Sequence, residues 1–162
     1  MSVYFCSDLH LGHTNLILNK RGFKSTEEHD EYVIDNWNKT VHKKDKIFLL
    51  GDIAMETHKY YPLLGRLKGL IHLIPGNHES PQHIKHLLQY VNTISGNIKY
   101  KEFWLSHMPI HPDELRGKKN IHGHVHELSL KDDRYINVSL EVIGYKPISI
   151  DEIRDSINKK GS

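Results

Sequence analysis

Side chains that could bind metal ions recur at five places in this chain, each directly after a short apolar run. In order they are Asp8 with His10, Asp52, Asn77 with His78, His107, and His124 with His126. An Asp-x-His or a Gly-Asp alone occurs often by chance, but five such sites in succession indicate one metal centre. The side chains of Asp8 and His10 also point the same way in an extended chain, because side chains alternate with period two.

The number of candidate ligands decides which kind of centre is expected. A structural zinc ion takes four ligands, whereas two ions about 3.5–4 Å apart, bridged by a shared carboxylate, would use seven. Nitrogen and oxygen ligands without a thiolate suit Mn²⁺, Fe or Zn²⁺ and argue against calcium. We therefore expect two divalent ions, with Mn²⁺ favoured and Fe, Zn²⁺ or Ni²⁺ as alternatives. The seven candidates are Asp8, His10, Asp52, Asn77, His107, His124 and His126.

The apolar runs before these residues predict the strands that position them. The first three strands are expected at residues 3–6, 46–50 and 70–74. When such strands lie side by side in an open α/β sheet, groups just beyond their carboxyl ends meet at one edge. A Pro-Gly pair ends the third strand abruptly and places an Asn-His pair at that edge.

Helix signals lie between these strands. Ser25 and Glu28 form a capping box that predicts the start of an amphipathic packing helix. Further helical segments are expected at residues 57–67 and from Pro81 onward, the latter with Ser80 as its N-cap. Strands that alternate with helices indicate the α/β class.

The second half of the chain is richer in predicted strands and ends in a helix. The last two strands are expected to form an antiparallel pair that turns at Gly144 and Tyr145, before a helix that begins with a capping box at Ser149 and Glu152. The strands are predicted at residues 91–95, 98–105, 119–121, 135–143 and 146–150.

Length and composition predict one domain, residues 1–162, of a soluble protein. A chain of 162 residues can bury about 70% of the surface that it exposes when unfolded. A formal charge of +2 gives no electrostatic reason to expect a nucleic-acid or membrane partner. The only cysteine, Cys6, and the lack of a membrane-spanning or signal-peptide pattern favour the cytoplasm. The sequence leaves the oligomeric state open.

The motifs resemble those of the calcineurin-like metallophosphoesterase family. That family has Asp-x-His, Gly-Asp, Gly-Asn-His-Asp/Glu, a lone His and Gly-His-x-His, and all five occur here in order between Asp8 and His126. The small size and the opening Ser-Asp-Leu-His-Leu-Gly-His look like the compact bacterial and phage phosphodiesterase branch. The resemblance implies a four-layer α/β/β/α sandwich of two packed mixed sheets flanked by helices.

The resemblance also implies a role for each motif residue. The bridging hydroxide of a dinuclear centre would attack phosphorus in line. His78 would bind no metal and would instead stabilise the transition state or protonate the leaving oxygen. The first ion would be held by Asp8, His10 and His126, and the second by Asn77, His107 and His124, with Asp52 as the bridge.

One departure from the family pattern bears on the substrate. The protein-phosphatase branch has Asp and Arg where this chain has Met55 and Glu56, so what orients His78 is left open. A carboxylate at Glu56 would repel a monoester dianion, which favours a small phosphodiester or nucleotide as the substrate. Arg21 is the nearby basic candidate for binding it. A phosphomonoesterase or nuclease with the same centre, or a non-catalytic scaffold, are the alternatives.

The remaining nine histidines are interpreted as packing or surface residues. They are His13, His29, His42, His58, His72, His83, His86, His111 and His122.

Overall fold

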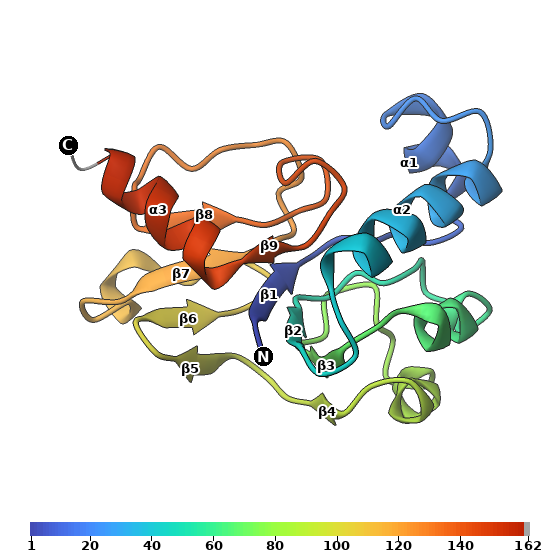
Figure 1. Ribbon diagram of the computed structural model, residues 1–162, viewed down its shortest axis with the longest axis horizontal. Helices are drawn as coiled ribbons and strands as arrows, with labels where there is room; N and C mark the ends of the chain where they lie inside the picture. The colour runs from blue at the N-terminus through green and yellow to red at the C-terminus, as the bar shows by residue number, and fades with distance from the viewer. Residues whose placement is uncertain (161–162) are drawn as a thin grey trace.

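Two mixed β-sheets form the centre of the computed structural model, which describes residues 1–160 (Figure 1). The first sheet has the order β4-β3-β2-β1-β9, and only β9 runs antiparallel to its neighbour. Its strands in chain order are β1 (Val3–Cys6), β2 (Lys46–Leu49), β3 (Leu70–Leu73), β4 (Thr93–Ile94) and β9 (Ile148–Ser149).

The second sheet has the order β5-β6-β7-β8, in which only the β5–β6 pair is antiparallel. Its strands are β5 (Ile98–Tyr100), β6 (Phe103–Leu105), β7 (Lys119–His122) and β8 (Tyr135–Asn137).

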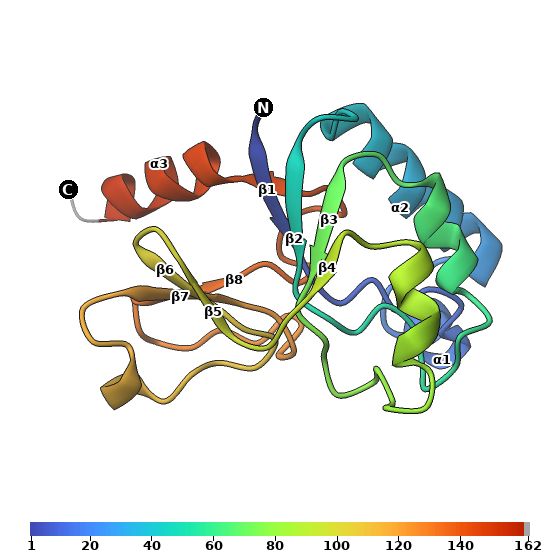
Figure 2. The same ribbon diagram turned by 90° about the horizontal axis from the view of Figure 1, so that it is seen from below.

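The helical elements lie on both sides of the first sheet. Figure 2 shows α1 and α2 on one side, while α3 lies on the other side, beside the second sheet. No helix within residues 1–160 is both long and apolar enough to cross a membrane. The α-helices are α1 (Thr14–Asn19), α2 (Thr26–Thr40) and α3 (Ile150–Lys160), and the 3₁₀ helices are η1 (Tyr61–Arg66), η2 (Ile84–Gln89) and η3 (Pro112–Glu114).

Alternating side chains of the first sheet build two separate cores. On one face Phe5 and Phe48 pack with Phe103 and Leu105 of the second sheet. On the other face the strands pack against α2, whose Trp37 is fully buried. Each strand end is thus fixed by packing on both of its faces, as the apolar runs predict. The predicted α/β architecture of two packed mixed sheets with flanking helices is confirmed.

Two predicted helices are 3₁₀ turns instead. The segment at 57–67 forms only η1, which contains Pro62 and Gly65, two residues that disfavour an α-helix interior. After Pro81 the chain makes turns and then η2, and the hydroxyl of Ser80 has no hydrogen-bond partner among the described residues. The expected N-cap bond is therefore not made.

The predicted antiparallel pair at the end of the chain is wrong. β8 pairs parallel with β7 in the second sheet, whereas β9 pairs with β1 in the first. Between them the chain crosses from one sheet to the other, and the backbone N–H of Leu140 donates to the Ser7 carbonyl. Pairing of β8 and β9 with strands of different sheets outweighs the local turn that lies between them in sequence. The predicted strand 98–105 is likewise two strands, β5 and β6, because Lys101 turns with φ 53°.

Candidate metal centre

The five sequence motifs meet where the strands of both sheets end. The loops that follow β1 and β2 run side by side, and the backbone N–H groups of Asp8 and His10 donate to the carbonyls of Gly51 and Asp52. On the second sheet, the backbone N–H of His124 donates to Oδ2 of Asp8. These bonds join residues more than a hundred positions apart into one site.

Backbone conformation marks the same residues. Eight non-glycine residues within 1–160 have positive φ, and five of these are predicted ligands. A non-glycine residue in this region costs about 1–3 kcal/mol and persists only when the surrounding structure enforces it, most often at functional sites. The five are Asp8, His10, Asp52, His124 and His126, with φ between 47° and 70°.

The candidate ligands form two groups, and Asp52 belongs to the second. In one, ligand atoms of Asp8, His10 and His126 all lie within 4.8 Å of one another. In the other, Asp52 lies within the same range of His107 and His124. The Oδ2 atom of Asp52 is 3.3 Å from Nε2 of His107 and 3.7 Å from Nε2 of His10, so this carboxylate faces both groups.

Asn77 and His78 complete the site from the loop after β3. The Oδ1 atom of Asn77 lies 3.0 Å from Nε2 of His107. Nε2 of His78 lies 3.9 Å from Oδ2 of Asp52, and this ring could also join a ligand group with His10 and Asp52. The His78 side chain is 23% exposed, more than that of His10 or His107. It is therefore the more accessible of these rings to a substrate.

Buried polar atoms without partners show that the site suits a cation. Among the described residues, Oδ1 of Asp8 and Nε2 of His10 are buried and make no hydrogen bond, although they lie only 3.6 Å apart. Buried polar atoms are almost always satisfied, and an ion between these two would satisfy both. The other oxygen of Asp8 accepts hydrogen bonds from His124 and Ser139, which leaves Oδ1 free to face the ion.

Hydrogen bonds at the far side of two rings aim their other nitrogen into the site. Nδ1 of His107 donates to the Leu50 carbonyl at 2.6 Å, so Nε2 is the nitrogen that faces Asp52 and would bind an ion there. Nδ1 of His126 donates to Glu141 at 3.0 Å, while its Nε2 lies 3.9 Å from Asp8. This is how metal-bound histidines are commonly held.

The carboxylates of the site are held in the ionised form that binds a metal ion, whereas its histidines differ from one another. Burial opposes ionisation of Asp8, but the contact with His10 and the charge of His107 outweigh it and hold the pKa of Asp8 below its ordinary value. The pKa of Asp52 is likewise lowered, because the contact with His107 outweighs burial. Burial lowers the pKa of His10, whereas contact with Asp52 outweighs burial and raises the pKa of His107, and contact with Glu141 raises the pKa of His126. Ionised carboxylates and neutral imidazoles are the forms that bind a cation, so an ion bound by His107 and His126 would displace their protons.

Close contacts explain why glycine occurs in two of the motifs. A Cβ atom at Gly76 would clash with Asp52, and one at Gly123 would clash with Ser7 and Asp8. Each glycine lets one motif loop approach another, so a side chain there would push the ligands apart.

Glu79, the last residue of the Gly-Asn-His-Glu motif, joins two of these loops. It is buried, and its carboxylate accepts hydrogen bonds from the backbone N–H groups of Asp52, Ile53 and Gly76. Glu79 therefore fixes the loop after β2 against the loop after β3.

The prediction that Arg21 binds substrate is contradicted by its burial. Its side chain is 0% exposed, and its guanidinium donates to the carbonyls of Asp8 and Leu9 and to the carboxylate of Glu141. Arg21 thus holds the loop after β1 from behind. Sequence reasoning missed Glu141, which lies 120 positions from Arg21 and belongs to no local motif.

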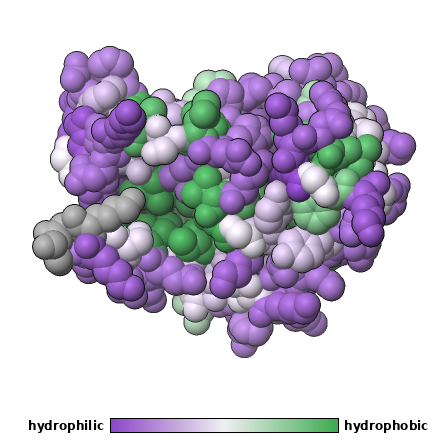
Figure 3. All heavy atoms as spheres, turned by 90° about the horizontal axis from the view of Figure 1, so that it is seen from above, coloured by the Kyte–Doolittle hydropathy of each residue, from purple (hydrophilic) through white to green (hydrophobic). Residues whose placement is uncertain are grey.

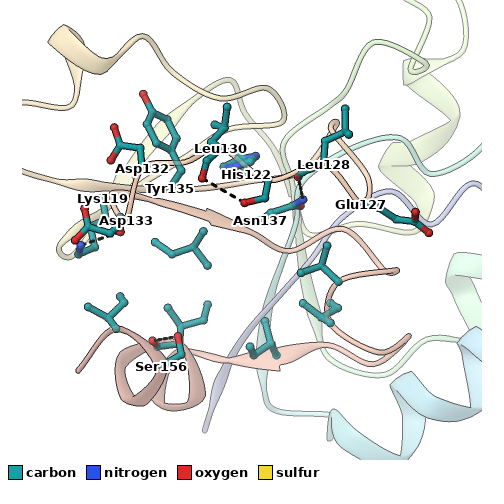
Figure 4. A pocket seen from close by; sticks show the side chains of 17 residues that line it. Lys119, His122, Glu127, Leu128, Leu130, Asp132, Asp133, Tyr135, Asn137 and Ser156 are labelled. Atoms are coloured by element: carbon teal, nitrogen blue, oxygen red, sulfur yellow. Dashed lines mark hydrogen bonds between the residues drawn. The ribbon is translucent and has the colours of Figure 1, made fainter. Parts of the chain in front are cut away.

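A cavity of about 490 Å³ lies away from this site, between β8, the loop after β7 and α3. Figure 4 shows Ser156 of α3 on one side of it and Asp132 and Tyr135 on the other. Hydrophobic side chains are exposed in a hollowed patch on one face of the molecule (Figure 3). None of the seven candidate ligands lines the cavity. We place the chemistry at the metal-ligand cluster, because reactive groups and orphaned polar atoms gather there.

Comparisons with known proteins agree with this geometry. The family model of calcineurin-like phosphoesterases matches residues 1–158. The protein MJ1445 of Methanocaldococcus jannaschii is 36% identical, over 97% of this chain and 92% of its own length. The crystal structure of AQ665 from Aquifex aeolicus has a TM-score of 0.75 at 26% identity and covers 96% of this chain and 98% of its own. The nuclease MPE of Pseudomonas putida, with a TM-score of 0.50 at 18% identity over 76% of this chain and 61% of its own, shares the fold alone.

Proposed function

This chain belongs to the calcineurin-like phosphoesterase family, and from that membership we propose that it is a phosphodiesterase with two divalent metal ions. One observation carries the proposal: ligand atoms of one group lie within 4.8 Å of one another, and Asp52, whose carboxylate lies 3.7 Å from His10 of that group, belongs to a second group with the same spacing. The first group is Asp8, His10 and His126, and the second is Asp52, His107 and His124. A single ion would not need seven ligands, whereas two ions that share Asp52 would use all seven.

The first ion would be held by one carboxylate and two imidazoles, and the second by an amide oxygen and two imidazoles. When bound, such ions supply positive charge to the phosphate oxygens and acidify water. A ligand set of mixed nitrogen and oxygen suits Mn²⁺, with Fe, Zn²⁺ and Ni²⁺ as alternatives. The sets are Asp8, His10 and His126 for the first ion, and Asn77, His107 and His124 for the second, with Asp52 shared.

His78 would act on the substrate rather than on the metal. Its ring is partly exposed at the edge of the ligand cluster, and its backbone N–H donates to Oδ1 of Asp52 at 3.0 Å. This bond fixes the loop while leaving the imidazole free to move toward a phosphate. There it can stabilise the developing charge or give a proton to the leaving oxygen.

The charges around His78 favour a diester over a monoester. Oε1 of Glu56 lies 3.8 Å from Nδ1 of His78, which makes Glu56 a candidate for the group that orients this ring. A carboxylate here repels a monoester dianion more strongly than a diester monoanion. The Arg21 side chain is buried and paired with Glu141, so it is not available to contact the substrate.

Two chromogenic substrates test the proposal directly. Bis-p-nitrophenyl phosphate should be hydrolysed with a higher kcat/KM than p-nitrophenyl phosphate when Mn²⁺ is present. An Asp52→Asn preparation, purified identically, controls for contaminating phosphatases. A preference for the monoester at the same metal concentration and pH would overturn the diesterase assignment.

A parallel assay with DNA as the substrate separates a nuclease from an enzyme for small diesters. The name of the Pseudomonas putida neighbour makes DNA a substrate worth including. The formal charge of +2 supplies little attraction for a polyanion. Cleavage of single- or double-stranded DNA with a kcat/KM above that of small diesters would make this chain a nuclease.

A further inference from the structure

Three histidines that the proposed catalytic centre does not use gather elsewhere on the molecule. His58 lies in the loop after β2, while His83 and His86 lie at the start of η2 and within it. One ring nitrogen from each lies within 4.8 Å of the other two. The three rings therefore form a cluster from two separate loops, which we call the three-histidine cluster.

The spacing within the three-histidine cluster is that of ligands on a single ion. Nδ1 of His58 lies 3.1 Å from Nδ1 of His83. Two imidazole nitrogens on a tetrahedral zinc ion, each about 2.0–2.1 Å from the metal, are separated by roughly 3.3 Å. His86 has a ring nitrogen within 4.8 Å of the other two, and its ring is stacked on His58 at a centroid distance of 4.3 Å, so it would turn out of this stack to bind the same ion. His83, the N-cap of η2, and His86 are three residues apart, a spacing that places side chains on one side of a 3₁₀ helix, and their ring centroids lie 6.3 Å apart.

The donor atoms of the cluster favour a different metal from the Mn²⁺ proposed for the catalytic centre. The cluster offers three imidazoles and no carboxylate, and such a set favours Zn²⁺ strongly over Mn²⁺. His58 is exposed, which leaves the site open to water as a fourth ligand.

We propose that His58, His83 and His86 form a Zn²⁺ site distinct from the catalytic centre. The ion would link the loop that contains Glu56 to the segment that follows His78. Since Glu56 and His78 lie 3.8 Å apart, Zn²⁺ would hold together the two loops that flank the substrate side of the centre. This inference does not depend on the proposed reaction.

The zinc content of variants tests the site. Wild type, His58→Ala and the His83→Ala/His86→Ala double variant are saturated with Zn²⁺, freed of unbound metal by gel filtration, and analysed for zinc per chain. Both variants should hold one ion fewer than wild type. His111→Ala removes another exposed ring, 72% accessible, and should retain the wild-type content. The difference between proteins is informative however many ions the catalytic centre holds.

Hydrogen exchange tests the link between the loops. Addition of Zn²⁺ to Mn²⁺-loaded protein should slow amide exchange at residues 54–60 and 81–90 in wild type and His111→Ala, but not in His58→Ala. His58 is exposed, so its loss leaves the core intact even if the double variant does not fold. Equal zinc contents in wild type and His58→Ala would overturn the site. If His58→Ala holds one zinc ion fewer than wild type but Zn²⁺ does not slow amide exchange in wild type, the link between the loops is overturned.

Discussion

Glu141 accepts a hydrogen bond from Nδ1 of His126 at 3.0 Å, and the same oxygen of Glu141 accepts one from Arg21 at 2.8 Å. Arg21 in turn donates to the carbonyl of Asp8. A single chain of contacts therefore holds two candidate ligands from behind, one after β1 and one after β7. In such an arrangement the carboxylate sets the tautomer and the direction of the imidazole.

Replacing Glu141 should weaken metal binding without removing a ligand. Glu141→Ala is expected to lower Mn²⁺ affinity about 10–100-fold, the usual effect of losing a carboxylate that positions a metal-bound histidine. Glu141→Gln keeps an oxygen that can accept from His126 and should restore most of the affinity. Electron paramagnetic resonance of free Mn²⁺ during a titration measures both variants. Equal losses in Ala and Gln would show that Glu141 acts through its charge rather than by positioning the ring.

The shared carboxylate should be indispensable to the metal centre. We expect Asp52→Asn to reduce kcat by at least about 100-fold, since its loss must exceed the 10–100-fold effect of an outer partner. Metal content should fall in parallel. The fold should persist, because Asp52 lies beyond the end of β2 and outside both apolar cores. Elemental analysis and circular dichroism check these outcomes, and an active variant with two ions would exclude Asp52 as the bridge.

His78 should affect turnover far more than metal binding. His78→Ala is expected to lower kcat roughly 10²–10⁴-fold, the range typical of a general acid or base. Its metal content should equal that of wild type. Glu56→Gln, which removes the charge beside His78, should have a smaller effect on kcat. If His78→Ala loses an ion instead, the ring is a ligand, as its position near His10 and Asp52 would also allow.

Removal of Glu79 should destabilise the fold as well as the site. Glu79→Ala leaves three backbone N–H groups without their acceptor, and each unsatisfied buried donor costs about 1–3 kcal/mol. Allowing for access of water, we expect the free energy of unfolding to fall by about 3 kcal/mol. Urea denaturation in the presence of a chelator measures this without a contribution from bound metal. Glu79→Gln retains one acceptor oxygen and should lie between Ala and wild type.

The meeting of the candidate ligands could be predicted from the sequence because their signals are local. Each candidate ligand follows an apolar strand within a few positions, and parallel strands end at a common edge. Once the strands at residues 3–6, 46–50 and 70–74 were recognised, the meeting of Asp8, Asp52 and the Asn-His pair followed. The glycines of the motifs carry the same information, since each permits two loops to touch.

The features that local signals do not predict depend on contacts between residues far apart in the sequence. Arg21 looked like a basic surface residue, but the fold buries it against Glu141, 120 positions away. The turn at Gly144 suggested a hairpin, yet β8 and β9 gain more by joining different sheets. His58 carries no pattern that connects it to His83, and only the packing of two loops brings their rings together. Short-range sequence spacing determines which groups lie at a strand end, whereas the choice of partner across the chain depends on burial and sheet pairing, which the tertiary structure alone decides.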